Sequence, residues 1–210
     1  MIRIFIVDDH AIVREGVKRI ISDTTDMEIA GEAENGLKAT REIADGLCDV
    51  VLLDLNLPGM DGFEVLRTLK ARTSPPSVII LSIYPEEDYA VRAYKEGAMG
   101  YLTKESLPGE LIHAIRRVAA GKKYVSESMG ERLMGDATGA SNRPPHESLS
   151  AREYEVFRLI TAGKTVKEIA AKLSIAPTTV SSYRMRIFEK MKIKTNLDLI
   201  RYAVEHGLVG

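Results

Sequence analysis

Three aspartates near the ends of two apolar stretches could together bind a metal ion. Asp8 and Asp9 follow IRIFIV, and Asp54 follows VVLL and precedes the turn at Pro58-Gly59. Carboxylates that converge at one place repel each other unless a cation lies between them. Oxygen ligands with room for water suit Mg²⁺, which in turn favours phosphate. The three side chains therefore indicate a magnesium site that handles a phosphoryl group.

A hydroxyl and an ammonium group follow two later apolar stretches. Ser82 ends SVIILS, and Lys104 comes shortly after MGYLT. A lysine and a hydroxyl opposite a set of carboxylates could hold the oxygens of a phosphoryl group. Each residue alone also has a structural explanation, since Asp8 or Asp9 could cap a helix and Lys104 could be a surface lysine. Because all of these residues follow strand-like stretches, one common site is favoured over separate structural roles.

Strand-like and helical patterns alternate regularly along the first 120 or so residues, and the strand-like stretches come just before these side chains. The strand-like stretches are IRIFIV, MEIAGEA, DVVLLD, SVIILS and MGYLT, and helical spacing of apolar residues recurs between them. Five strands that alternate with helices predict a doubly wound, five-stranded parallel sheet of the flavodoxin-like type. In such a sheet, ligands bind outside the carboxyl ends of the strands. The candidate residues lie at those ends.

A polar segment separates this pattern from the rest of the chain. Residues 123–147 include Pro144-Pro145 and many small polar residues, which predicts a linker. Within it, the stretch VSESMGERL is expected to form a short helix. The domain boundaries predicted from the sequence are thus 1–122, 123–147 and 148–210.

Residues 148–210 show helical spacing without a strand pattern and predict a small, all-α, four-helix domain. Ser150 and Glu153 form the pattern of a capping box at the first helix. Residues 146–210 carry 11 Lys and Arg against 7 Asp and Glu, whereas the preceding residues carry 18 against 23. A basic tail behind an acidic front half is typical of nucleic-acid binding, although a solvated basic helix face would give the same balance.

Residues 1–122 resemble the receiver domain of a two-component response regulator. The resemblance is carried by the pair Asp8-Asp9, by Asp54 with Asn56, and by the residues at the last two strand ends. It implies that Asp54 accepts a phosphoryl group from the phosphohistidine of a sensor histidine kinase. It also implies that Asp9, Asp54 and the main-chain carbonyl of Asn56 bind Mg²⁺, with Asp8 assisting through a water molecule.

The same resemblance implies a switch next to the acceptor. Lys104 would pair with the phosphoryl oxygens, and Ser82 would move its hydroxyl onto the phosphate. Tyr101, three residues before Lys104, would then turn inward into the vacated space. Phosphorylation adds charge and acceptor oxygens, which can bias such a two-state arrangement.

Residues 148–210 resemble the helix-turn-helix output domain of the LuxR/NarL type. The matching positions are Glu153, Gly163, Glu168-Ile169-Ala170, Leu173 and Thr179-Val180. With the receiver, this resemblance covers nearly the whole chain. It implies a bacterial transcription regulator that binds double-stranded promoter DNA and forms a homodimer when phosphorylated.

The third helix of this domain, starting near Pro177, is expected to enter the major groove. Its inward face is predicted to be Val180, Tyr183, Ile187 and Met191. Relatives often carry lysines at the positions of Ser181 and Met185, so the base contacts are expected to fall more on arginines. The predicted DNA-binding residues are Ser181, Ser182, Arg184, Met185, Arg186, Lys190, Lys192 and Lys194. The three lysines are expected to contact phosphates.

Two apolar surfaces are candidates for the homodimer contact. One is formed by Leu111, Ile115 and Val118 in the last receiver helix, and the other by Ile200 and Val204 in the final helix. Both helices must also cover their own cores, so the sequence leaves the choice open.

Two other functions remain as alternatives. An aspartate-nucleophile phosphatase needs a second carboxylate two residues after the first, where this chain has Asn56. A phosphatase assay with a general phosphomonoester would test that alternative. An adaptor whose tail binds protein or RNA would be tested by gel-shift competition between duplex DNA and RNA. We expect no enzyme activity beyond the chain's own phosphoryl uptake and hydrolysis.

The composition narrows the protein class further. Hydrophobic residues make up 45% of the chain and charged residues 28%, and no apolar run approaches the length of a membrane span. We therefore expect a cytoplasmic protein without a membrane partner. The single cysteine, Cys48, excludes an internal disulfide and is expected to be a buried, inert thiol.

Overall fold

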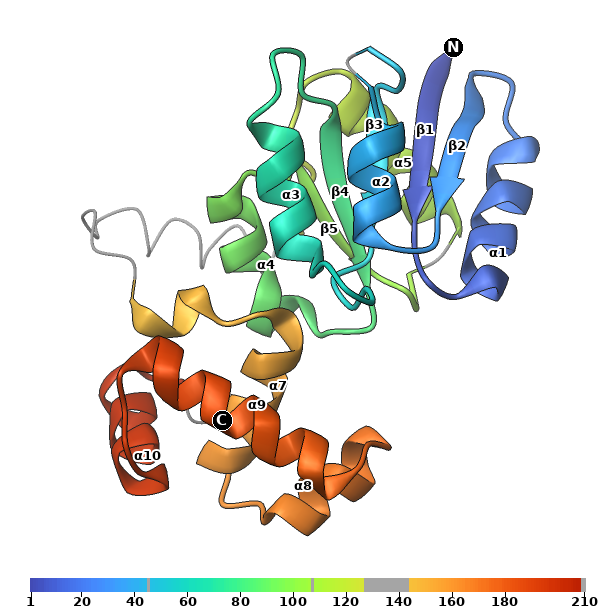
Figure 1. Cartoon of the computed structure of the whole chain (residues 1–210). Helices are drawn as coiled ribbons and strands as arrows, with labels where there is room; N and C mark the ends of the chain where they lie inside the picture. The colour runs from blue at the N-terminus through green and yellow to red at the C-terminus, as the bar shows by residue number, and fades with distance from the viewer. Residues whose placement is uncertain (45, 107, 127–143, 209–210) are drawn as a thin grey trace. The chain divides into compact units, whose positions relative to one another are not determined.

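The computed structural model describes residues 1–44, 46–106, 108–126 and 144–208. It divides into two compact units, Met1–Ala140 and Ser141–Gly210 (Figure 1). The predicted helix in VSESMGERL, residues 125–133, lies almost entirely outside the described residues.

The first unit is a five-stranded parallel sheet with the strand order β2-β1-β3-β4-β5, as predicted. The strands are β1 (Ile2–Val7), β2 (Met27–Ala33), β3 (Val50–Leu53), β4 (Ser77–Ser82) and β5 (Gly100–Thr103). The order reverses between β1 and β3, because β2 lies on one side of β1 and all later strands lie on the other. Polar residues at the ends of β1 and β3 therefore meet at the point where such sheets bind ligands.

A helix follows each strand and covers the sheet on both faces. The helices are α1 (Ala11–Ser22), α2 (Gly36–Glu42), α3 (Gly62–Lys70), α4 (Glu86–Glu96) and α5 (Pro108–Ala119). Helices α1 and α5 cover one face, and α2, α3 and α4 cover the other (Figure 1). All four residues of β3 are buried, which explains why its sequence is a continuous apolar run.

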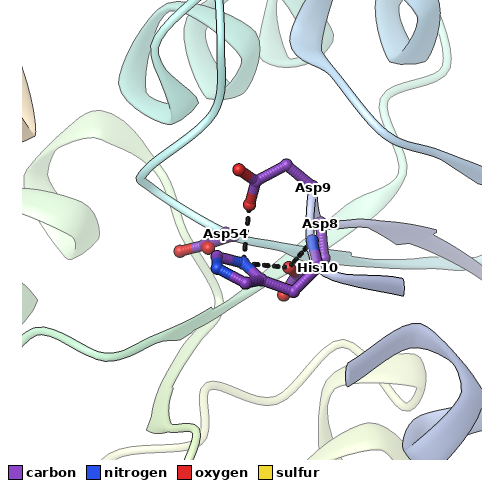
Figure 2. Close-up of side chains that lie close together, drawn as sticks. All are labelled: Asp8, Asp9, His10 and Asp54. Carbon is purple, nitrogen blue, oxygen red and sulfur yellow. Dashed lines mark hydrogen bonds and ion pairs between the residues drawn. The ribbon is translucent and has the colours of Figure 1, made fainter. Parts of the chain in front are cut away.

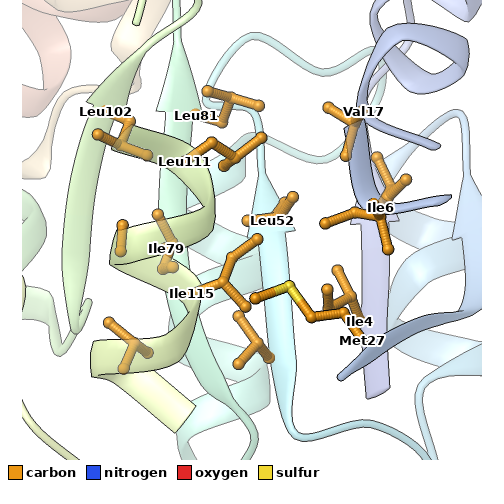
Figure 3. Packing of buried hydrophobic residues seen from close by; sticks show 14 residues of the cluster. Ile4, Ile6, Val17, Met27, Leu52, Ile79, Leu81, Leu102, Leu111 and Ile115 are labelled. Atoms are coloured by element: carbon orange, nitrogen blue, oxygen red, sulfur yellow. The ribbon is translucent and has the colours of Figure 1, made fainter. Parts of the chain in front are cut away.

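The core beneath α1 and α5 holds the strand ends in fixed positions. Side chains from neighbouring strands, such as Ile6, Leu52 and Ile79, pack against Val17 of α1 and Ile115 of α5 (Figure 3). Close packing of branched side chains leaves the strands little freedom. The polar groups at the strand ends are thus carried by a rigid support.

The apolar residues of α5 are part of this core. Leu111 is 4% exposed, and Ile115 and Val118 are fully buried. Their side chains are therefore not exposed for a dimer contact, which excludes this one of the two candidate surfaces. They instead pack in the core between α5 and the strands that it covers.

The second unit contains the four predicted helices, preceded by a short 3₁₀ helix. The elements are η1 (Pro145–Ser148), α7 (Ala151–Thr161), α8 (Val166–Leu173), α9 (Pro177–Met191) and α10 (Asn196–Glu205). The predicted capping box of α7 is present, because the Glu153 N–H donates to Ser150 Oγ and the Ser150 N–H donates to Glu153 Oε2. No helix among the described residues is long and apolar enough to span a membrane.

The thiol of Cys48 is buried beside β3, as the sequence predicted. Burial disfavours the thiolate and raises the pKa of Cys48 from 9.0 to about 11. We expect iodoacetamide to leave the native protein unmodified at pH 8 and to alkylate it rapidly in urea. Rapid alkylation without denaturant would contradict the burial of this thiol.

The same pKa shift has a consequence for stability. Above pH 9 the unfolded chain loses the thiol proton that the folded chain keeps, so the free energy of unfolding falls between pH 9 and pH 11. The slope attributable to Cys48 is at most about 1.4 kcal/mol per pH unit. Denaturant titrations of the wild type and of Cys48→Ala over this range would isolate it.

Candidate functional site

Carboxylates from the ends of two adjacent strands meet at the edge of the sheet. Asp8 directly follows β1 and is 2% exposed, and Asp54 directly follows β3 and is 1% exposed. Together with Asp9 and His10, each offers a ligand atom within 4.8 Å of the others (Figure 2). The three aspartates are brought together as the sequence predicted.

The predicted lysine and hydroxyl lie against the same carboxylates. Lys104 Nζ is 2.6 Å from Oδ2 of Asp8 and 2.6 Å from Oδ2 of Asp54. Ser82 Oγ donates to Oδ1 of Asp54 over 3.1 Å, and the main-chain N–H of Asn56 donates to the same oxygen over 3.2 Å. Both oxygens of Asp54 are therefore held by donors, which fixes the orientation of the carboxylate.

The charges of this site do not balance. Burial raises the pKa of Asp54 because it disfavours the carboxylate, although Lys104 opposes this shift. Burial also opposes the charge of Lys104, but Asp54 and Asp8 outweigh it and raise the pKa of the lysine. One ammonium group thus faces the carboxylates of Asp8, Asp9 and Asp54. This excess of negative charge attracts a cation.

The donor set fits a small, hard cation. Three carboxylates lie close enough to share one ion, and such oxygens are the ligands preferred by Mg²⁺, Ca²⁺ and Mn²⁺. A cluster of acidic residues that could bind a metal ion therefore lies at the edge of the sheet.

The two residues predicted to act as a switch, Ser82 and Tyr101, lie near Asp54. Tyr101 is 1% exposed, and its hydroxyl donates to the main-chain carbonyl of Tyr84 over 2.9 Å. Ser82 contacts Asp54 and Tyr101 is buried, so both side chains point inward in this structure. The predicted movement of Ser82 and Tyr101 stays a prediction. Tyr84 was not among the predicted site residues, and only its position two residues after Ser82 could have indicated it.

The outward face of α9 carries most of the predicted base-contacting residues. Ser182 and Arg186 are exposed, and Met185 is 63% exposed. Ser181 and Arg184 are half-buried, and the Arg184 guanidinium carbon lies 5.9 Å from the centre of the Phe188 ring. The predicted inward residues are buried or half-buried.

The three lysines at the end of α9 differ from one another. Lys192 and Lys194 are exposed. Lys190 is exposed as well, but its Nζ lies 2.6 Å from Oε2 of Glu153, the buried carboxylate of the α7 capping box. No sequence pattern indicates this pair, because 37 positions separate the two residues. Lys190 therefore has a structural partner in addition to its predicted role at DNA.

Helix α10 leaves an apolar face uncovered. Leu197 is 67% exposed and Val204 is 63% exposed, and the half-buried Ile200 lies between them at helical spacing. Leu199 and Ala203, on the other face, are fully buried. Of the two predicted dimer surfaces, only this one is open. Leu197 was not among the predicted residues of this surface, although its spacing to Ile200 and Val204 could have indicated it.

Two family models together match most of the chain. The model of the response regulator receiver domain matches residues 4–116. The model of bacterial regulatory proteins of the luxR family matches residues 147–203. The first match covers the acidic site, and the second covers α7, α8, α9 and most of α10.

Full-length relatives match along nearly their whole length. The response regulator UvrY of Escherichia coli K12 is 35% identical over 209 residues, which cover 99% of this chain and 96% of UvrY. The response regulator GacA of Pseudomonas aeruginosa PAO1 is 36% identical over 213 residues, which cover 100% of this chain and 98% of GacA.

Solved structures of response regulators are similar to this chain as well. ChrA, of a heme-sensing two-component system, is 30% identical with a TM-score of 0.53, over 99% of this chain and 98% of ChrA. RcsB, solved as two dimers bound to two parallel DNAs, is 25% identical with a TM-score of 0.59, over 97% and 98%. The chain therefore belongs to the response regulators of two-component systems that join a receiver domain to a LuxR-type DNA-binding domain.

Proposed function

We propose that this response regulator is a transcription regulator switched by phosphorylation of Asp54, with a sensor histidine kinase as the phosphoryl donor. The observation that carries the proposal is the buried Asp54 carboxylate, held between Lys104, Ser82 and the carboxylate of Asp8. A buried carboxylate with a purely structural role needs only one cationic partner. Asp54 instead shares the ammonium group of Lys104 with Asp8 and also lies close to Asp9, so negative charge is in excess. Such a site suits a metal ion and a phosphoryl group together.

The chain's own residues position and stabilise the transferred group. A carboxylate oxygen of Asp54 attacks phosphorus as the P–N bond to the kinase histidine breaks, and the histidine leaves with the bonding electrons. Lys104, already 2.6 Å from Asp54, pairs with a phosphoryl oxygen. Ser82 Oγ, 3.1 Å from Asp54, donates to another. Both contacts stabilise charge that develops during the transfer.

Mg²⁺ is the proposed cofactor of this step. Asp9, Asp54 and the main-chain carbonyl of Asn56 would hold it, with Asp8 assisting through water. When bound, it supplies positive charge that neutralises the carboxylates and the phosphoryl oxygens. We propose no other enzyme activity, because Asn56 has no carboxylate with which to act as the acid or base of a phosphatase.

The second domain is proposed to bind promoter DNA through α9, whose exposed face carries Ser182, Met185 and Arg186. Helix-turn-helix proteins commonly bind paired half-sites as two-fold dimers. RcsB, which this chain resembles, was solved as DNA-bound dimers. The exposed face of α10, formed by Leu197, Ile200 and Val204, is the proposed dimer contact.

Phosphorylation is expected to shift a monomer–dimer equilibrium towards the dimer. Sedimentation of the full chain before and after treatment with acetyl phosphate and Mg²⁺ measures this shift. In Val204→Glu, two glutamates would meet across the two-fold axis, and like charges there cost several kcal/mol. We expect the dimer dissociation constant of this variant to rise roughly hundredfold.

Leu37→Glu provides a matched control, because Leu37 is an exposed apolar residue of the receiver outside the proposed contact. Its dimerisation should equal that of the wild type. An unchanged sedimentation profile after phosphorylation would contradict the proposed switch. Normal dimerisation of Val204→Glu would instead contradict only the assignment of the contact to α10.

A further inference from the structure

The imidazole of His10 lies inside the acidic cluster (Figure 2). His10 Nδ1 is 2.7 Å from Oδ1 of Asp9 and 3.2 Å from Oδ1 of Asp8. Its side chain is 52% exposed, so neither packing nor burial dictates this position. The proposed metal binding and phosphoryl transfer by the three aspartates do not involve this histidine.

Lys104 and His10 contact different oxygens of the cluster. Lys104 pairs with Oδ2 of Asp8 and Oδ2 of Asp54. The Oδ1 atom of Asp8 accepts a hydrogen bond from the main-chain N–H of His10 over 2.8 Å and also faces its ring. A cation that binds Asp9 directly and Asp8 through water, away from the lysine, therefore comes next to His10 Nδ1.

The imidazole can contribute a nitrogen ligand from this position. In the contact of 2.7 Å with Asp9, Nδ1 donates its proton to the carboxylate; a cation that replaces this proton would find a lone pair on Nδ1, while Nε2 keeps the other ring proton. Two donors bound to one cation at roughly 2.1 Å lie about 3–4 Å apart. The ligand atoms of His10, Asp8, Asp9 and Asp54 lie within 4.8 Å of one another, so small side-chain rotations would bring His10, Asp9 and Asp54 to one ion, with Asp8 a water molecule away.

We propose that His10 is a nitrogen ligand of the divalent-cation site and gives it a preference for transition-metal ions over Mg²⁺. The proposal rests on the proposed function, since it concerns the same cation site. Carboxylates suit Mg²⁺, whereas imidazole suits transition metals, whose affinity for nitrogen and oxygen sites exceeds that of alkaline-earth ions. His10 thus determines which cation occupies the site at a given metal supply.

Titration calorimetry of the untagged full chain with Co²⁺ and with Mg²⁺ tests the proposal. In His10→Ala, the Co²⁺ affinity is expected to fall about 10–100-fold, and the Mg²⁺ affinity should change by less than about twofold. The visible absorption of bound Co²⁺, which depends on its ligands, should change in the same variant. His10→Asn, which keeps a polar side chain and the main-chain N–H, should lose Co²⁺ affinity likewise.

His206→Ala is the matched control. His206 lies in the second domain, where its ring centroid is 6.2 Å from that of His146. Removal of His206 should leave the affinity of the acidic cluster for Co²⁺ unchanged. Equal losses for both cations in His10→Ala would overturn the proposal. A gain for both would also overturn it, because the imidazole would then compete with the ion.

The outcomes for the wild type separate this proposal from the proposed function. Binding of Mg²⁺ without a preference for Co²⁺ would overturn the role of His10 alone. Binding of neither cation would overturn the proposed Mg²⁺ site as well.

Discussion

Asp54→Ala is expected to take up no phosphoryl group from acetyl phosphate and Mg²⁺, whereas the wild type takes up one per chain. Asp54 is the carboxylate that both Ser82 and Lys104 contact, so the donors needed by a bound phosphoryl group converge on it. Intact-mass spectrometry measures the uptake, and the added group should be lost on brief exposure to base. Stoichiometric uptake by the variant would refute the assignment of the acceptor.

The variant is expected to fold, which makes the test informative. Lys104 keeps Asp8 as a partner at 2.6 Å, so the substitution leaves no unpaired ammonium in the site. Burial raises the pKa of Asp54, which means that the ionised carboxylate is held at a cost in the folded state. Thermal unfolding of the variant should therefore remain cooperative.

Two further variants serve as controls. Asp23→Ala removes an exposed aspartate at the end of α1 and should be phosphorylated like the wild type. Asp9→Asn keeps the acceptor but removes a proposed Mg²⁺ ligand, so it should need a higher Mg²⁺ concentration for the same uptake. An unchanged Mg²⁺ dependence of Asp9→Asn would argue against Asp9 as a ligand.

Arg186→Ala is expected to weaken binding to the specific promoter site by about 1–3 kcal/mol and binding to random DNA much less. Arg186 is exposed on the face of α9 that carries Ser182 and Met185, where a guanidinium group can reach base edges. Genome-wide mapping of bound DNA would supply the specific site, and fluorescence anisotropy would measure both affinities. Equal losses on both DNAs would make Arg186 a phosphate contact.

Lys192→Ala provides the contrasting result. Lys192 is exposed beyond the last turn of α9, so its loss should weaken specific and random DNA alike. The slope of log affinity against log salt should flatten by about one unit. Lys190→Ala should flatten it less, because the Lys190 ammonium group is paired with Glu153. An equal effect of both substitutions would show that the Glu153 pair opens at DNA.

The sequence by itself determined the sheet and most of the acidic site. Strand and helix periods are local properties, and the rules of chain crossover then leave few arrangements of five strands. Because parallel strands end at one edge, the residues after those strands had to converge there. Asp8, Asp54, Ser82 and Lys104 could therefore be assigned before any coordinate was known.

Tertiary structure decided which apolar faces are covered and which charges are paired. The apolar spacing of α5 and α10 is similar in the sequence, yet Ile115 is fully buried and Val204 is 63% exposed. Periodicity identifies an apolar face but not the area that neighbouring elements cover. The pairing of Lys190 with Glu153 likewise depends on two side chains, 37 positions apart, that only the packed chain brings to 2.6 Å.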